Sequence, residues 1–180
     1  MKIGVWILII LSVFAFSLSG YNLYLALTHP LKFKDEIVLC SKEFNLSPAL
    51  VASLIKAESS FNENAKSNKD AIGLMQIKLS TANYLNDLKN ENHITEEQLF
   101  DAKSNIKYGC EYLNYLTKKF QNVNTVLASY NAGETRVRSW LKSKEYSTDG
   151  ITLKYIPYEE TKNYVEKVNK NLKYYSRIFQ

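Results

Sequence analysis

Apolar residues recur along most of this chain at the three- and four-residue spacing of an amphipathic helix, and strand-like alternation is scarce. The clearest predicted helix covers residues 48–58. Ser47 is well placed to cap its first turn, Pro48 is tolerated in that turn, and good helix formers follow without interruption. The pattern therefore predicts a mainly α-helical protein.

The same signals predict further helices towards the C-terminus. A short helix is expected over residues 125–131, with Asn124 as its N-cap and Gly133 at its end. A long last helix is expected from Pro157, in its first turn, to about residue 178, because apolar residues return there at core spacing.

The N-terminus is a separate apolar segment. From Ile3 to Leu31 there is no Asp, Glu, Lys or Arg. A helix of about 25 residues reaches about 37 Å, enough to cross a hydrocarbon core of about 30 Å. A cleaved signal peptide is the alternative, with small residues at positions 17, 19 and 20, but apolar residues resume after them. A membrane anchor is therefore favoured over residues 1–31, and one domain is expected over residues 32–180.

Composition and charge exclude several classes of function. The formal net charge is +5, and the basic residues alternate with acidic ones, whereas a nucleic-acid-binding surface needs a concentrated basic face. The few His and Cys residues are too far apart to indicate a zinc site, and we expect no metal or cofactor. Cys40 and Cys110 each fall on an apolar helix face, which fits either a disulfide or two buried free thiols.

Glu58 is the most unusual residue of the predicted helix. It follows Val51, Leu54 and Ile55 at helical spacing, on the stripe that should be buried. A low-dielectric site disfavours the charged carboxylate and raises its pKa, which produces a general acid that is still protonated near neutral pH. A structural acid at a helix end, held by a hydrogen-bond partner, fits this feature equally well.

The segment after Glu58 favours a binding cleft. A polar loop over residues 62–70 leads into a tight turn at Gly73–Gln76, where glycine permits backbone geometry or close packing that a side chain would block. Gln76 adds an amide that can both donate and accept hydrogen bonds. Such groups suit a neutral ligand rich in hydroxyl and amide groups, such as an amino sugar polymer.

A series of short motifs continues from Glu58 to the end of the chain. They are Glu58–Ser59, Ser67, Ala71–Gln76 followed by Ser80–Ala82, Asn105–Ile106 with Gly109, Tyr112 and Leu113, Ala128–Gly133, Ile156–Tyr158, Glu160–Thr161 and Tyr164–Val165. In this order and spacing, the sequence resembles the lytic transglycosylases of the soluble lytic transglycosylase type, in glycoside hydrolase family 23. Each motif is weak alone, but together they make the resemblance specific.

The resemblance implies a lysozyme-like helical domain behind the N-terminal apolar helix, and cleavage of the β-1,4 bond between N-acetylmuramic acid and N-acetylglucosamine in peptidoglycan. Glu58 would act first as acid and then as base. The muramyl C6 hydroxyl would attack the anomeric carbon in place of water, which leaves a 1,6-anhydro end. The resemblance also implies these substrate-binding residues: Ser67, Met75, Gln76, Tyr130, Asn131 and Glu160.

Peptidoglycan glycan strands are therefore the expected partner, and no protein partner is indicated. Because peptidoglycan lies outside the cytoplasmic membrane, this activity requires the domain over residues 32–180 to lie on the extracytoplasmic side. The domain would be either anchored to the cell membrane by the N-terminal segment or secreted after signal cleavage. The lysines that flank the apolar segment do not decide its orientation.

Some of these residues also have purely structural interpretations. Tyr130 and Asn131 fall at a predicted helix end, and Glu160 falls in a first turn, where the helix dipole favours a carboxylate. Aromatic residues at helical spacing serve helix packing more often than ligand binding. We therefore expect no site role for three tyrosines: Tyr108, Tyr112 and Tyr115.

Ordinary glycosidases use two carboxylates, and the candidates for a second one are Glu63 and Asp70. Glu63 falls in a solvated segment. Asp70 is better explained as a loop cap, although it could instead direct a water and favour hydrolysis. Lys78 follows the Gly turn where goose-type lysozymes place an acid, which favours transglycosylation. The alternatives are a hydrolytic muramidase and a non-catalytic wall-binding module on the same fold.

Local signals also predict helix caps and a loop. Thr95 and Gln98 have the spacing of a capping box, and Ser80 can cap the helix after the Gly turn. The longest polar interruption, over residues 142–154, is expected to form a flexible loop over the cleft.

Overall fold

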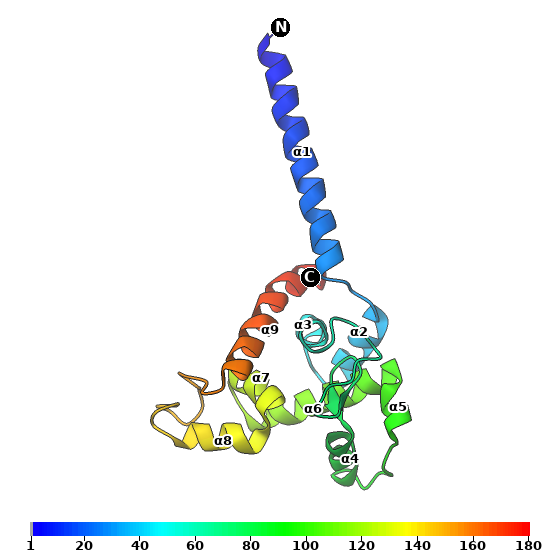
Figure 1. Ribbon diagram of the computed structural model, residues 1–180, viewed down its shortest axis with the longest axis vertical. Helices are drawn as coiled ribbons and strands as arrows, with labels where there is room; N and C mark the ends of the chain where they lie inside the picture. The colour runs from blue at the N-terminus through cyan, green and yellow to red at the C-terminus, as the bar shows by residue number, and fades with distance from the viewer. Residues whose placement is uncertain (1) are drawn as a thin grey trace. The chain divides into compact units, whose positions relative to one another are not determined.

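The computed structural model describes residues 2–180, and within the first helix it describes the side chains at positions 6, 7, 10–17, 19, 20, 23–25 and 28. The chain divides after Leu31 into two compact units. The first unit contains α1 (Lys2–Thr28), a continuous helix in Figure 1. Among the residues described, no helix combines the length and the apolar character that a membrane crossing requires.

The second unit, residues 32–180, is mainly α-helical, as the sequence predicts. Over the described residues, one two-stranded hairpin accompanies the helices. The elements are, in chain order, α2 (Lys34–Glu43), α3 (Pro48–Glu58), β1 (Ala71–Ile72), β2 (Ile77–Lys78), α4 (Leu79–Asp87), α5 (Glu96–Phe100), α6 (Ala102–Lys119), α7 (Val123–Ala132), α8 (Glu134–Lys142) and α9 (Glu159–Ile178).

α3 is the central helix of this unit. It packs along α9 and against α2, and α7 also packs against α9 (Figure 1). Ser47 caps α3 by accepting a hydrogen bond from the backbone N–H of Leu50 at 3.4 Å, and Pro48 occupies the first turn, as predicted. Residues 49–55 are all buried. α3 therefore carries Glu58, its last residue, to the edge of the core.

The hairpin of β1 and β2 follows the polar loop after α3. The strands are antiparallel, with Ala71 opposite Lys78 and Ile72 opposite Ile77. The turn that joins them contains Gly73 with φ +72°, a left-handed conformation that favours glycine. The turn therefore has the tight geometry that the sequence predicts.

The side chain of Asn105, on α6, holds this turn in place through hydrogen bonds to the backbone. Its side chain is fully buried, and its Oδ1 accepts a hydrogen bond from the backbone N–H of Met75 at 2.8 Å. Its Nδ2 donates to the carbonyls of Ile72 at 2.8 Å and Leu99 at 2.9 Å. A Cβ added to Gly73 would collide with the Asn105 amide. One buried side chain therefore sets the position of the turn relative to α6.

Two predicted helix starts are wrong by two residues. Asn122 caps α7 instead of Asn124, because its Oδ1 accepts the backbone hydrogens of Asn124 at 2.9 Å and Thr125 at 3.1 Å. Pro157 lies outside α9, which has Tyr158 as its N-cap. The start of α7 offers two asparagines as caps, and local preferences do not choose between them. The start of α9 has no side-chain cap, so nothing in its sequence fixes the first residue.

The other local predictions have mixed outcomes. The capping box of Thr95 and Gln98 is confirmed, with both of its hydrogen bonds present. Ser80 does not cap α4, because β2 runs directly into the helix and places Lys78 at the N-cap. Residues 142–154 do not line the cleft described below. Asp149 holds part of that loop together by accepting backbone hydrogen bonds at 2.8 and 2.7 Å from the residues that follow it.

Cys40 and Cys110 are both buried and free. Cys40 lies on α2, Cys110 lies on α6, and their thiols interact where the two helices pack together. The structure therefore agrees with the interpretation as buried free thiols. The predicted core face of α6 is also buried, including Ile106, Leu113 and Leu116.

Candidate active site

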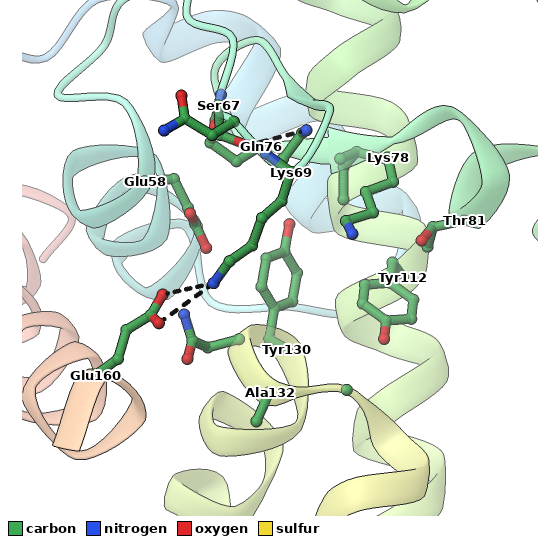
Figure 2. Close-up of a pocket in the computed structure, with 15 residues that line it drawn as sticks. Glu58, Ser67, Lys69, Gln76, Lys78, Thr81, Tyr112, Tyr130, Ala132 and Glu160 are labelled. Atoms are coloured by element: carbon green, nitrogen blue, oxygen red, sulfur yellow. Dashed lines mark hydrogen bonds and ion pairs between the residues drawn. The ribbon is translucent and has the colours of Figure 1, made fainter. Parts of the chain in front are cut away.

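A cleft of about 610 Å³ opens beside the C-terminal end of α3 (Figure 2). Its walls come from the loop after α3, the hairpin, the first turn of α4, the middle of α6, the end of α7 and the first turn of α9. Most of the segments that the sequence motifs mark are therefore brought together around one cavity. Most of its lining groups are hydroxyls, amides, aromatic rings and charged side chains.

Glu58 lies in this cleft at the end of α3. Its side chain keeps partial solvent access through the opening, but protein atoms enclose the carboxyl on most sides. Burial raises the pKa of Glu58 to about 7, while the Tyr164 hydroxyl and the positive charge of Lys167 act in the opposite direction. A carboxyl with this pKa exchanges its proton near neutral pH.

Tyr164 and Lys167 both come from α9, which packs along α3. The buried Tyr164 hydroxyl is close enough to Glu58 to lower the pKa of the carboxyl, although it completes no hydrogen bond of good geometry among the described residues. Lys167 Nζ donates a hydrogen bond to the carbonyl of Ala57 at 2.6 Å, which holds its charge one residue from Glu58. α9 therefore supplies the two groups that favour the ionised form of Glu58.

Tyr130 of α7 forms the inner wall of the cleft. Its hydroxyl donates a hydrogen bond to the carbonyl of Met75 at 2.9 Å, and its ring lies 5.3 Å from the Tyr112 ring, centroid to centroid. Burial raises the pKa of Tyr130 well above its usual value, so the hydroxyl stays protonated. Tyr130 thereby links α7 to the turn after β1.

Ser67 and Gln76 shape the wall nearest the hairpin. Ser67 Oγ accepts hydrogen bonds from the backbone N–H groups of Lys69 at 3.2 Å and Ala71 at 3.1 Å, which closes the loop before β1. Gln76 Nε2 donates to the carbonyls of Ala65 at 3.2 Å and Gly73 at 2.9 Å. Because its amide hydrogens are used in this way, the carbonyl oxygen of Gln76 is the part best placed to accept from a ligand.

Asn131 and Glu160 lie where α7 meets α9. Asn131 Oδ1 accepts a hydrogen bond from the Thr161 hydroxyl at 2.8 Å. The Glu160 carboxylate forms an ion pair with Lys69 Nζ at 3.3 Å, and both side chains are about 70% exposed. Figure 2 shows the Lys69 side chain reaching across the opening towards Glu160.

The structure brings most of the predicted site residues into one cleft. Those that line it together with Glu58 are Ser67, Gln76, Tyr130, Asn131 and Glu160. Met75 is the exception: its side chain is fully buried and would meet any Cβ placed at Gly109, so only its carbonyl takes part, through Tyr130. Glu63 and Asp70, the candidates for a second carboxylate, are exposed and do not line the cleft.

Sequence reasoning missed several residues of the cleft wall. Tyr112, to which the sequence assigns only a packing role, lines the cleft, as do Thr81 and Lys69. Lys78, which the sequence analysis places directly after the Gly turn, also lines it. Tyr112 lies one turn after Gly109, at the margin of the core stripe of α6. A residue at that margin can face either the core or a cavity, and helical spacing alone does not decide which.

The chain matches a known protein family. The family described as Transglycosylase SLT domain matches residues 38–151. The chain is 33% identical over 143 residues to the soluble lytic murein transglycosylase of Salmonella typhimurium, covering 77% of this chain and 22% of that protein. It is also 33% identical over 125 residues to the membrane-bound lytic murein transglycosylase E of Buchnera aphidicola, covering 63% of this chain and 56% of that protein.

Solved structures show the same likeness. An inactive mutant of the lytic transglycosylase Slt from Pseudomonas aeruginosa superposes with a TM-score of 0.74 at 28% identity, over 85% of this chain and 25% of that chain. The 70 kDa soluble lytic transglycosylase from Escherichia coli superposes with a TM-score of 0.73 at 29% identity, over 83% of this chain and 25% of that chain. The chain thus spans about a quarter of the length of these proteins, and it belongs to the transglycosylase SLT domain family.

Proposed function

We propose that this protein is a peptidoglycan lytic transglycosylase that uses Glu58 as its one acid and base. The observation that carries the proposal is the environment of Glu58, an acid with a pKa of about 7 that opens on a cleft of tyrosine, amide and hydroxyl groups. Such a carboxyl is largely protonated below neutral pH and can give its proton to a leaving oxygen. The names of the relatives, lytic murein transglycosylases, support peptidoglycan as the substrate.

The proposed reaction has two steps. Glu58 first protonates the oxygen of the β-1,4 bond, the bond from that oxygen to the muramyl anomeric carbon breaks, and the N-acetylglucosamine hydroxyl leaves. The Glu58 carboxylate then takes the proton of the muramyl C6 hydroxyl, whose oxygen bonds to the anomeric carbon. Glu58 is protonated again, and the strand ends in a 1,6-anhydromuramyl residue. Tyr164 and Lys167 stabilise the carboxylate that exists between the two steps.

The positions of the other carboxylates favour this route over hydrolysis. Enzymes that hydrolyse glycosides usually hold a second carboxylate near the acid. Glu63 and Asp70 lie outside the cleft, and Glu160 at its rim is exposed and ion-paired with Lys69. Attack by a hydroxyl of the substrate itself does not require a second carboxylate to direct water.

We also propose that residues 1–31 anchor the protein in the cell membrane, with the catalytic unit on the extracytoplasmic side. The support is the apolar sequence from Ile3 to Leu27, the absence of Asp, Glu, Lys and Arg as far as Leu31, and the need to reach a substrate outside the membrane. One of the relatives is named as membrane-bound. Secretion after signal cleavage is the alternative.

Analysis of the glycan ends tests the reaction. Peptidoglycan digested with the purified protein is expected to release fragments that end in 1,6-anhydromuramic acid, which mass spectrometry separates from reducing ends by the mass of one water. Reducing muramyl ends would instead identify a hydrolytic muramidase. If no fragments form although the protein binds the strands, the protein would be a non-catalytic binding module.

The activity is expected to depend on the protonated form of Glu58. Since the pKa of Glu58 is about 7, kcat/KM should change little below about pH 6 and fall about tenfold per pH unit above about pH 8. A series of kcat/KM values across pH, measured on soluble glycan strands, gives the midpoint of this fall. A midpoint near 4.5, the ordinary value for a glutamic acid, would contradict the proposed environment.

Tyr164→Phe is the matched variant for this pH profile. The Tyr164 hydroxyl lowers the pKa of Glu58, so its removal should shift the midpoint to higher pH. A variant that only loosened the packing would admit water and shift the midpoint the other way, towards lower pH.

A further inference from the structure

Two lysines line the cleft, and they differ in their partners. Lys69 is paired with Glu160 at 3.3 Å. Lys78 is exposed, and across the described part of the chain its ammonium has no ion pair or hydrogen bond with another residue. Glu58 is largely neutral below pH 7, and the Lys69–Glu160 ion pair carries no net charge. The positive charge of Lys78 therefore has no opposite charge to neutralise it in the cleft.

The fold holds Lys78 in a fixed place relative to the acid. It is the last residue of β2, and the pleat of this strand buries Ile77 and turns Lys78 to the opposite side. Figure 2 shows Lys78 on the side of the cleft towards Thr81 and Tyr112, with Tyr130 between it and Glu58. An anionic group bound by Lys78 would therefore lie on the side of Tyr130 that faces away from Glu58.

The substrate of the proposed function offers one such group. Each muramyl residue carries a lactyl ether whose carboxyl is either joined to a peptide stem by an amide bond or free as a carboxylate. The amide is neutral, whereas the free carboxylate can pair with an ammonium group. A lysine without a partner in the cleft thus distinguishes the two states of the strand.

We propose that Lys78 binds the free lactyl carboxylate of a muramyl residue, so that the protein prefers glycan strands from which the peptide stems have been removed. This proposal rests on the proposed function and adds the substrate class. The strands would be supplied by a reaction that hydrolyses the amide between the lactyl group and the stem. For one partly exposed ion pair in a cleft, the preference is expected to be about 5- to 10-fold.

The test compares two strands that differ in the charge of their lactyl groups. Stem-free glycan strands are used as such, or after their carboxyls have been converted to neutral methylamides. Dissociation constants are measured by calorimetry on the full-length protein carrying Glu58→Gln, so that no strand is cleaved. The charged strand should bind about 5- to 10-fold more tightly, and the difference should shrink as salt is added.

Variants of Lys78 in the same Glu58→Gln background assign the preference. Lys78→Met should reduce the affinity ratio to about one, and Lys78→Arg should restore most of it, because the charge returns. Lys103→Met is the matched control: it removes the same charge at an exposed position of α6 outside the cleft and should leave the ratio as it is. Equal binding of both strands by the parent protein, or a preference that survives Lys78→Met, would overturn the proposal. Because binding is measured without cleavage, this result is separate from failure of the transglycosylase proposal.

Discussion

Glu58→Gln is expected to lower kcat/KM on peptidoglycan strands by about 10³- to 10⁴-fold, near the upper limit for the loss of one acid and base. Glutamine keeps the size and hydrogen-bonding shape of the side chain but can neither give a proton to the leaving oxygen nor take one from the C6 hydroxyl. Both proposed steps lose their proton transfer together. The measurement is the initial rate of release of soluble fragments from purified cell-wall strands.

The same variant is expected to make the fold more stable at alkaline pH. The pKa of Glu58 is raised from 4.5 to about 7 in the folded protein, so the unfolded chain loses this proton more readily than the folded one. The stability that the protonated form provides is therefore complete below about pH 4.5 and is lost as the pH rises to about 7. Glutamine cannot ionise, and at pH 8 it should increase the free energy of unfolding by about 1–3 kcal/mol, allowing for the solvent access of the carboxyl.

Glu63→Gln is the matched control for both measurements. Glu63 is exposed on the loop after α3, only five positions further along the chain, and it does not line the cleft. Its variant should keep the activity of the parent protein and show no added stability at pH 8. If Glu58→Gln retained more than about a tenth of the parent rate, Glu58 would not be the acid, and the proposed mechanism would fail.

The residues that the sequence places correctly are those whose signals are local. Ser47, Pro48 and the capping box at Thr95 act within one helical turn, and the structure has them as predicted. Glu58 is recognisable because its position on an apolar stripe already implies burial, whichever partners surround it. Local chemistry and helical spacing are enough for such features.

The remaining features depend on contacts between distant segments. Met75 lies in the Gly turn that forms the cleft, but its side chain packs against Gly109 of α6, which no spacing rule predicts. Tyr112 is the opposite case: it lies at the margin of a core stripe in the sequence, but in the structure it lines the cleft. Lys78 is visible in the sequence only as a basic residue after the turn. The sequence does not show that Lys78 lacks a partner. That becomes evident only in the structure, where the exposed carboxylate of the cleft, Glu160, is paired with Lys69.

Asn105 shows how far the site relies on such a contact, since one buried amide on α6 makes three hydrogen bonds to the backbone of other segments. The turn that it holds carries Gln76 and, through the Met75 carbonyl, the hydroxyl of Tyr130. Packing alone does not replace these bonds, because each buried backbone group left without a partner costs about 1–3 kcal/mol. The position of the cleft wall is therefore set by a residue that does not touch the cleft.

Asn105→Ala is accordingly expected to lower the free energy of unfolding by about 3–5 kcal/mol, a large part of the stability of an ordinary domain. Denaturant unfolding of the full chain measures the loss. Asn163→Ala, the same change at an exposed position of α9, should alter stability by less than about 0.5 kcal/mol. A loss below about 1 kcal/mol for Asn105→Ala would mean that water takes over the three bonds. In that case the turn, and with it the wall of the cleft beside Glu58, would be held by the hairpin rather than by α6.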